Sequence, residues 1–148
     1  MRVVRVRLLL AEDDENDAIF FVRALKKAGV DVPVEIVNDG LAAVRRLSDP
    51  AGPPVTHVLL DLKMPLKTGL EVLEWMTARG QEGPRAAVYS SSKVEEDVAR
   101  AYAGGADFYL VKPAHTSELV RICQELGSWM GSGARPALSA DILLPRPG

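Results

Sequence analysis

Apolar residues along the chain alternate between short continuous runs and stripes with helical spacing. Val58, Leu59 and Leu60 are consecutive aliphatic residues, typical of a strand that is buried on both faces. Residues 16–28, in contrast, place apolar side chains at the i, i+3, i+4 and i+7 positions of a core-facing helix. Repeated along the sequence, this alternation predicts strands at 6–11, 34–37, 58–61, 86–90 and 108–111. The helices that follow them are predicted at 16–28, 41–47, 69–79, 94–103 and 117–130.

Strands that alternate with helices form a parallel sheet with right-handed crossovers, in either the Rossmann or the flavodoxin-like strand order. The turn after the first strand reads Glu12-Asp13-Asp14-Glu15, where a dinucleotide site would need a glycine-rich turn. Four acids there would repel a phosphate and attract a divalent metal. We therefore predict an α/β fold with a doubly wound five-stranded parallel sheet in the flavodoxin-like order 2-1-3-4-5, with helices on both faces.

The length of 148 residues, with 47% hydrophobic residues, suits one globular domain. We assign residues 1–130 to this domain. Residues 131–148 are rich in Gly, Ser and Pro, and we expect a flexible tail that is too short for an output domain.

The charge balance argues against some classes of partner. The net charge is −2, and no run reaches the roughly 20 apolar residues that span a bilayer, so we expect neither nucleic-acid nor membrane binding. The single cysteine, Cys123, excludes an internal disulfide framework and fits a reducing compartment. We expect a cytoplasmic protein.

Polar residues follow the ends of several predicted strands. Glu12 and Asp13 end the first strand, Asp61 ends the third, Ser90 ends the fourth, and Lys112 follows the fifth. In the 2-1-3-4-5 order these strands are neighbours, so the side chains line one edge of the sheet. Carboxylates this close raise one another's proton affinity unless a cation intervenes. Lysine together with Mg²⁺ at such an edge indicates a phosphoryl-transfer site.

Four segments, LLLAEDDENDA, VLLDLKMP, AVYSSS and DFYLVKPA, occur in this order at successive strand ends. With them the chain resembles, over roughly Val6 to Met130, the receiver domain of bacterial two-component response regulators. The EDDENDA start, the long loop before Asp61 and the Ser-Trp-Met end of the last helix are also similar to stand-alone receivers that serve bacterial phytochrome kinases.

The resemblance implies a role for each acid at the sheet edge. Asp61 would be the phosphoacceptor, phosphorylated by a sensor histidine kinase or by a phosphotransfer protein. Asp13 and Asp61 would bind Mg²⁺ directly, together with the backbone carbonyl of Lys63, and Glu12 would reach the metal through water. The kinase implied by the more specific resemblance is a bacterial phytochrome.

The resemblance also implies the residues that report phosphorylation. Lys112 would pair with the phosphoryl oxygens, and Pro113 would follow a cis peptide bond. Ser90 would be the switch hydroxyl, although the strand register leaves Ser91 open for this role. Tyr109 would be the coupled aromatic residue that changes rotamer, the alternative being an ordinary packing role.

Two surfaces are expected to contact partners. A homodimer would form through helix 94–103, strand 108–111 and helix 117–130. Ile19 and Phe20 lie outside the core stripe of the first helix and would dock on the kinase, unless both pack against the last helix.

We expect a phosphoacceptor with slow autodephosphorylation and not a turnover enzyme. Two alternatives use the same residues differently. A phosphorylation-independent receiver scaffold would not need the complete acidic and basic set. An aspartate-nucleophile phosphatase would need a second Asp two residues beyond the nucleophile, where this chain has Lys63.

Overall fold

The computed structural model describes residues 5–80 and 83–148. Its strands are β1 (Leu8–Ala11), β2 (Val34–Val37), β3 (His57–Leu60), β4 (Arg85–Ser90), β5 (Tyr109–Val111) and β6 (Leu143–Leu144). Its helices are α1 (Glu15–Lys27), α2 (Gly40–Ser48), α3 (Gly69–Ala78), α4 (Glu95–Ala103) and α5 (Thr116–Ser132). Each predicted strand and helix is present, with bounds that differ from the prediction by at most two residues.

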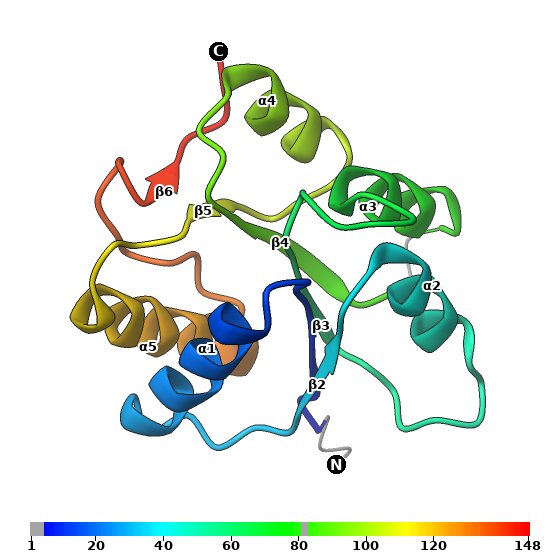
Figure 1. Cartoon of the computed structure of the whole chain (residues 1–148), viewed down its shortest axis with the longest axis horizontal. Helices are drawn as coiled ribbons and strands as arrows, with labels where there is room; N and C mark the ends of the chain where they lie inside the picture. The colour runs from blue at the N-terminus through cyan, green and yellow to red at the C-terminus, as the bar shows by residue number, and fades with distance from the viewer. Residues whose placement is uncertain (1–4, 81–82) are drawn as a thin grey trace.

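The strands form one sheet in the order β2-β1-β3-β4-β5-β6, and the first five are parallel (Figure 1). This confirms the flavodoxin-like order. The register pairs Ala11 of β1 with both Val37 and Leu60. The ends of β1 and β3 are therefore level, and the residues that follow them begin at the same edge of the sheet.

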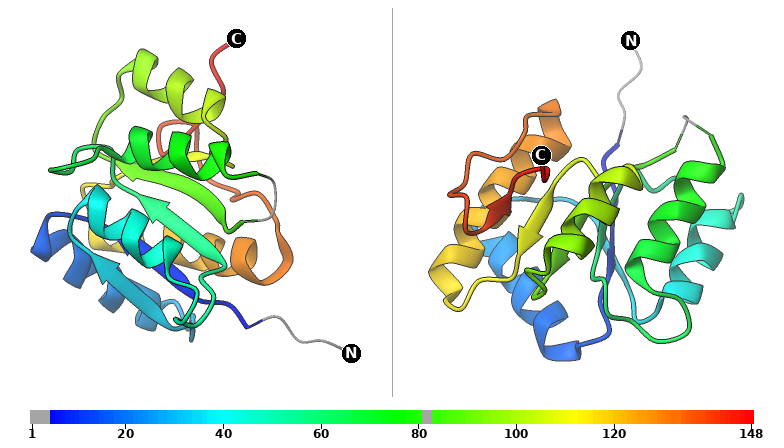
Figure 2. Two further views of the ribbon diagram at one scale, coloured as in Figure 1. Left: turned by 90° about the vertical axis from the view of Figure 1, so that its right-hand side faces the viewer. Right: turned by 90° about the horizontal axis from the view of Figure 1, so that it is seen from above.

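The sheet lies between two helical layers. Helices α1 and α5 cover one face, and α2, α3 and α4 cover the other (Figure 2). Side chains of the central strand β3 alternate between the two faces of the sheet. Leu59 packs with α1 and α5, while Val58 and Leu60 pack on the opposite side. All three are fully buried, which explains the continuous aliphatic run at this strand.

The C-terminal segment contains one strand that the sequence analysis does not predict. Leu143–Leu144 forms β6, which pairs antiparallel with β5 and adds a sixth strand beside it (Figure 1). Val111 donates a backbone hydrogen bond to Ile142, and Tyr102 donates its hydroxyl to the carbonyl of Leu144. The apolar Ile142-Leu143-Leu144 run is half-buried here, so it has enough apolar surface to pack although Gly, Ser and Pro dominate the tail.

Within the described residues, the helices are too short or too polar to cross a lipid bilayer.

Candidate functional site

Three carboxylates meet where β1 and β3 end. Glu12 follows β1 and is 1% exposed, and Asp61 follows β3 and is 6% exposed, while Asp13 faces solvent. Each contributes one oxygen to a group in which the three atoms lie within 4.8 Å of one another. The backbone N–H of Asp14 donates to Oε2 of Glu12 at 3.1 Å and fixes that side chain. The structure thus brings together the acids that the sequence predicted at this edge.

Lys112, just after β5, reaches into the same group. Its Nζ lies 2.6 Å from Oε1 of Glu12, 3.0 Å from Oδ2 of Asp61 and 2.8 Å from Oδ2 of Asp17. The lysine side chain is 13% exposed. One ammonium therefore holds carboxylates from two strand ends and one helix.

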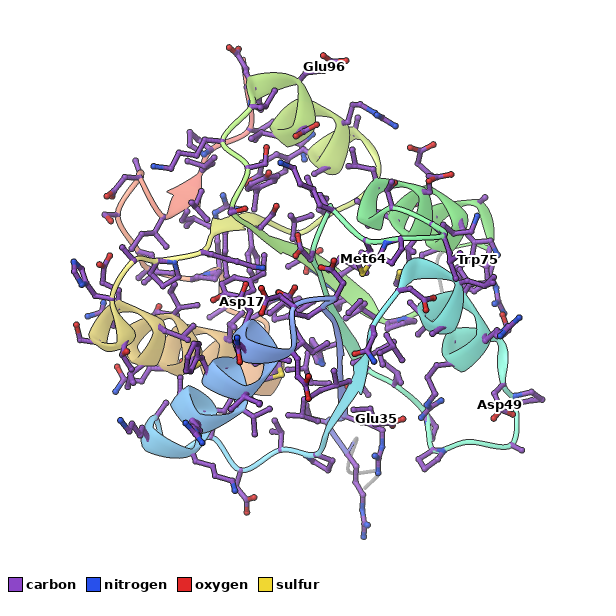
Figure 3. The ribbon with its side chains drawn as sticks, viewed as in Figure 1. Asp17, Glu35, Asp49, Met64, Trp75 and Glu96 are labelled. Atoms are coloured by element: carbon purple, nitrogen blue, oxygen red, sulfur yellow. The ribbon has the colours of Figure 1, made fainter. Side chains whose placement is uncertain are left out.

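Asp17 is the residue of this group to which sequence reasoning gave no role. It lies in the first turn of α1 (Figure 3), three residues after the N-cap Asp14, whose side chain accepts a hydrogen bond from the Asp17 N–H at 3.0 Å. The helix begins directly at the end of β1, so its first turn stands over the sheet edge. The signal available in the sequence was the extra acid in the EDDENDA segment.

Burial and charge shift the proton affinities at this site. Burial raises the pKa of Glu12 from its ordinary 4.5 to about 7, although the ammonium of Lys112 opposes the shift. For Lys112 burial acts to lower the pKa, but its bonds to Asp17, Glu12 and Asp61 outweigh burial and raise the pKa. The lysine is therefore a permanent cation, and Glu12 changes charge near neutral pH.

The donor set fits a divalent cation that prefers oxygen. Oε1 of Glu12 is buried, and within the described part of the chain its close polar partner is the ammonium of Lys112 at 2.6 Å. A cation near Glu12, Asp13 and Asp61 would compensate their charge, which a single lysine only partly balances. The residues needed for a divalent-metal site are therefore present at this edge.

The loop between β3 and α3 is held tightly against the Asp61 backbone. The N–H of Lys63 donates to Oδ1 of Asp61 at 3.3 Å, and Gly69 donates to the carbonyl of Leu62 at 3.1 Å. A Cβ at Gly69 would lie 2.1 Å from the carbonyl oxygen of Asp61, so only glycine fits there. Thr68 closes the loop with a capping box on α3. Met64 of this loop, labelled in Figure 3, has its side chain buried.

The predicted switch residues lie on the neighbouring strands. Ser90 ends β4 fully buried beside Val111 of β5, and its Oγ accepts a hydrogen bond from the Ser92 N–H at 3.3 Å. Ser91 faces solvent. Tyr109 is fully buried, burial raises the pKa of its hydroxyl, and the hydroxyl donates to the carbonyl of Ser92 at 2.8 Å.

The cis bond expected before Pro113 is absent, since the described residues contain only trans peptide bonds. Lys112 reaches the three carboxylates from a trans backbone, so the lysine needs no cis bond to point at them.

Comparison with known proteins identifies the family. The response regulator receiver domain matches residues 8–124. The "Probable methanogenesis regulatory protein FilR2" of Methanothrix harundinacea is 33% identical, over 87% of this chain and 86% of its own length. The response regulator Rcp1 of Synechocystis is 31% identical, over 88% of this chain and 92% of its own.

Solved structures agree with this match. The phosphorylated cyanobacterial phytochrome response regulator RcpA superposes with a TM-score of 0.79 at 27% identity, covering 89% of this chain and 98% of its own. The Mn²⁺-bound form of Rcp1 gives a TM-score of 0.77 at 29% identity, with 89% and 99% coverage. The fold, the acidic sheet edge and the sequence similarity all agree. This chain therefore belongs to the receiver domains of response regulators, the phosphorylation-dependent proteins of two-component signalling.

Proposed function

We propose that Asp61 accepts a phosphoryl group from a histidine kinase, or from a phosphotransfer protein, in a Mg²⁺-dependent reaction. The observation that carries the proposal is the position of Asp61, a nearly buried carboxylate at the end of the central strand. It lies within reach of two further acids and accepts a hydrogen bond from Lys112. This is the arrangement that phosphoryl transfer requires, namely a nucleophile with cations placed around the transferring group.

In the transfer, an oxygen of Asp61 attacks the phosphorus of a phosphohistidine. The phosphorus–nitrogen bond breaks, imidazole leaves, and an acyl phosphate forms on the aspartate. Asp13, Asp61 and the backbone carbonyl of Lys63 would hold Mg²⁺ directly, and Glu12 would hold it through water. A bound Mg²⁺ would neutralise negative charge on the phosphoryl group. Lys112, already hydrogen-bonded to Oδ2 of Asp61, would pair with a phosphoryl oxygen.

The phosphoryl group adds about −1.5 to −2 charges at the strand end. Ser90 would turn its hydroxyl toward a phosphoryl oxygen and draw the segment up to Ser92 with it. Because the hydroxyl of Tyr109 donates to the carbonyl of Ser92, this movement would change that hydrogen bond. The surface of α4, β5 and α5, which we call the α4–β5–α5 face, is thereby biased between two states.

Partner recognition would use apolar side chains beside the site. Ile19 and Phe20 of α1 are 41% and 53% exposed, so neither is packed away against α5. We propose that they dock on the kinase. Similarity to the phytochrome-associated regulators supports a bacterial phytochrome as that kinase.

A homodimer through the α4–β5–α5 face is the second proposed interaction. Strand β6 pairs with the edge of β5, so the second copy would meet α4, α5 and the tail and would not extend the sheet from β5. The protein would then act as a slowly self-dephosphorylating signal carrier and not as a turnover enzyme.

Two other functions use the same fold. A scaffold independent of phosphorylation is disfavoured because the three acids lie close together and Lys112 pairs with Glu12 and Asp61. An aspartate-nucleophile phosphatase is disfavoured because Lys63 stands where its second Asp would act, and the side chain of Lys63 is exposed.

Acetyl phosphate with Mg²⁺ is expected to add one phosphoryl group to the protein, detected by intact-protein mass spectrometry. The Asp61→Asn variant should show no addition, and excess EDTA should prevent it in the native protein. Asp49→Asn, a surface change at the C-terminal end of α2 (Figure 3), is the matched control and should behave as wild type. Phosphorylation that persists in Asp61→Asn, or rapid turnover of phosphate esters, would contradict the proposal.

Mg²⁺ is expected to raise the melting temperature more at pH 8 than at pH 6. Because folding raises the pKa of Glu12 to about 7, its contribution to stability is present at low pH and is lost as pH rises through that value. In the metal-free protein the repulsion between ionised Glu12 and the neighbouring carboxylates is therefore strongest at pH 8, and Mg²⁺ would reduce this repulsion. Glu12→Gln should shrink the difference between the two pH values. Equal stabilisation by Mg²⁺ at pH 6 and pH 8 would show that the Glu12 carboxylate does not interact with the metal.

Phe20→Ala is expected to slow phosphotransfer from the cognate kinase by about tenfold, the size of a typical interface anchor. The rate with acetyl phosphate should be unchanged, because this small donor does not need a docking surface on α1. Ile36→Ala, which removes an exposed apolar side chain from β2, controls for general surface effects. Equal slowing with both donors would place the defect in the site itself.

Light scattering over a range of concentrations tests the dimer. The mass is expected to approach twice that of the chain as concentration rises, and at lower concentration once beryllofluoride is added. A mass that stays monomeric with and without beryllofluoride would refute the dimer proposal while leaving phosphorylation of Asp61 intact.

A further inference from the structure

A cavity of about 350 Å³ lies at the edge of the sheet opposite the acidic group. Its walls come from the starts of β4 and β5, the end of α4, the end of α5 and the C-terminal tail. β4 begins at this cavity with Arg85 and ends at Ser90 beside the acidic group, so the two sites lie at opposite ends of one strand. The size is within the range of small-ligand sites.

Three arginines from distant parts of the sequence line this cavity. Arg135 donates from Nη1 to the carbonyl of Asp107 at 3.1 Å and from Nη2 to the hydroxyl of Tyr102 at 3.3 Å. The guanidinium of Arg146 stacks over the ring of Tyr102, 5.1 Å from its centroid. Arg85 pairs with Oδ2 of Asp107 at 2.7 Å. Tyr102 and Asp107 thus gather the three cations around one opening.

The positive charge in this cavity exceeds the negative charge. Asp107 is the single carboxylate among its lining residues, and it already accepts from Arg85 and from the indole N–H of Trp129. Over residues 5–80 and 83–148, neither Arg135 nor Arg146 forms an ion pair with an acid. Three guanidinium groups against one carboxylate leave two positive charges, enough to balance a dianion.

We propose that this cavity binds a small multivalent oxyanion of the diphosphate class. Guanidinium groups bind phosphate oxygens through paired, charge-assisted hydrogen bonds, and arginine is favoured over lysine for this purpose. The indole of Trp129 is buried and its N–H is engaged, so the cavity offers charge and polar groups more than a flat aromatic surface. The ligand is therefore recognised by its phosphate groups.

Binding there would also hold the C-terminal segment in place. Arg135 and Arg146 lie on either side of β6 in the sequence, whereas Arg85 is the first residue of β4. An anion shared by the three would join tail and domain, and would favour the state in which β6 is paired with β5. The site is thus a means of controlling the α4–β5–α5 face that does not involve Asp61.

The test is isothermal titration calorimetry of the full chain with sodium pyrophosphate, in EDTA and without a phosphodonor. Saturable binding at one site is expected. Arg135→Gln and Arg146→Gln should each raise the Kd by about tenfold or more, which corresponds to the loss of one charge-assisted hydrogen bond. Arg100→Gln is the matched control, because it removes the same charge from α4, where Arg100 pairs with Glu74 outside the cavity. Its Kd should change by less than about twofold, as for an exposed charge that makes no contact with the ligand.

Two readouts separate this site from the acidic group. The indole N–H resonance of Trp129 should shift with the same Kd as the heat signal, and Asp61→Asn should bind pyrophosphate as wild type does. Absence of saturable binding overturns the proposal, as does equal weakening in Arg100→Gln, which would indicate general charge attraction. Loss of binding in Asp61→Asn also overturns it, without bearing on phosphorylation.

Discussion

The ammonium of Lys112 between the carboxylates of Glu12, Asp17 and Asp61 is the interaction on which the functional end of this protein depends. Like charges at such distances repel one another strongly away from bulk water. The lysine permits Glu12 and Asp61 to stand almost buried at the ends of neighbouring strands. Because it is a single cation for three acids, charge remains uncompensated, and the site keeps an affinity for a further cation.

Local backbone geometry makes this arrangement possible. The parallel register sets the ends of β1 and β3 level, so the acids emerge at one height. α1 starts with the Asp14 cap, which turns Asp17 back over the edge. Gly69 allows the start of α3 to approach the Asp61 carbonyl more closely than any other residue would. The aliphatic strands provide the rigid frame, and polar contacts at their ends set the side-chain positions.

The part of this architecture that can be predicted from sequence is the part fixed by periodicity and chain order. The aliphatic run before Asp61 predicts a buried strand, and the strand order brings Asp61 next to Asp13 and Lys112. Asp17 could not be assigned because its role depends on the direction in which α1 leaves β1. The choice of Ser90 over Ser91 depends on a register that periodicity leaves open, and in the structure Ser90 is the buried one.

The tail shows the limit of composition as evidence. Its Gly, Ser and Pro content suggests disorder, but Ile142, Leu143 and Leu144 are enough to add a strand to β5. Tyr102, on α4, bonds that strand as well. The consequence is functional, because the tail lies on the face that responds to phosphorylation in our account. Whatever controls pairing of β6 would then influence the output of the domain.

The most direct test of this account is urea unfolding of Lys112→Met at pH 8 in EDTA. Removing the cation while keeping the side-chain length leaves Glu12, Asp17 and Asp61 facing one another. The free energy of unfolding is predicted to fall by about 3 kcal/mol or more, as when one partner of a buried ion pair is lost. Mg²⁺ should recover more stability in this variant than it adds to the wild type. An unfolding curve that coincides with that of the wild type in EDTA would contradict the central role of this lysine.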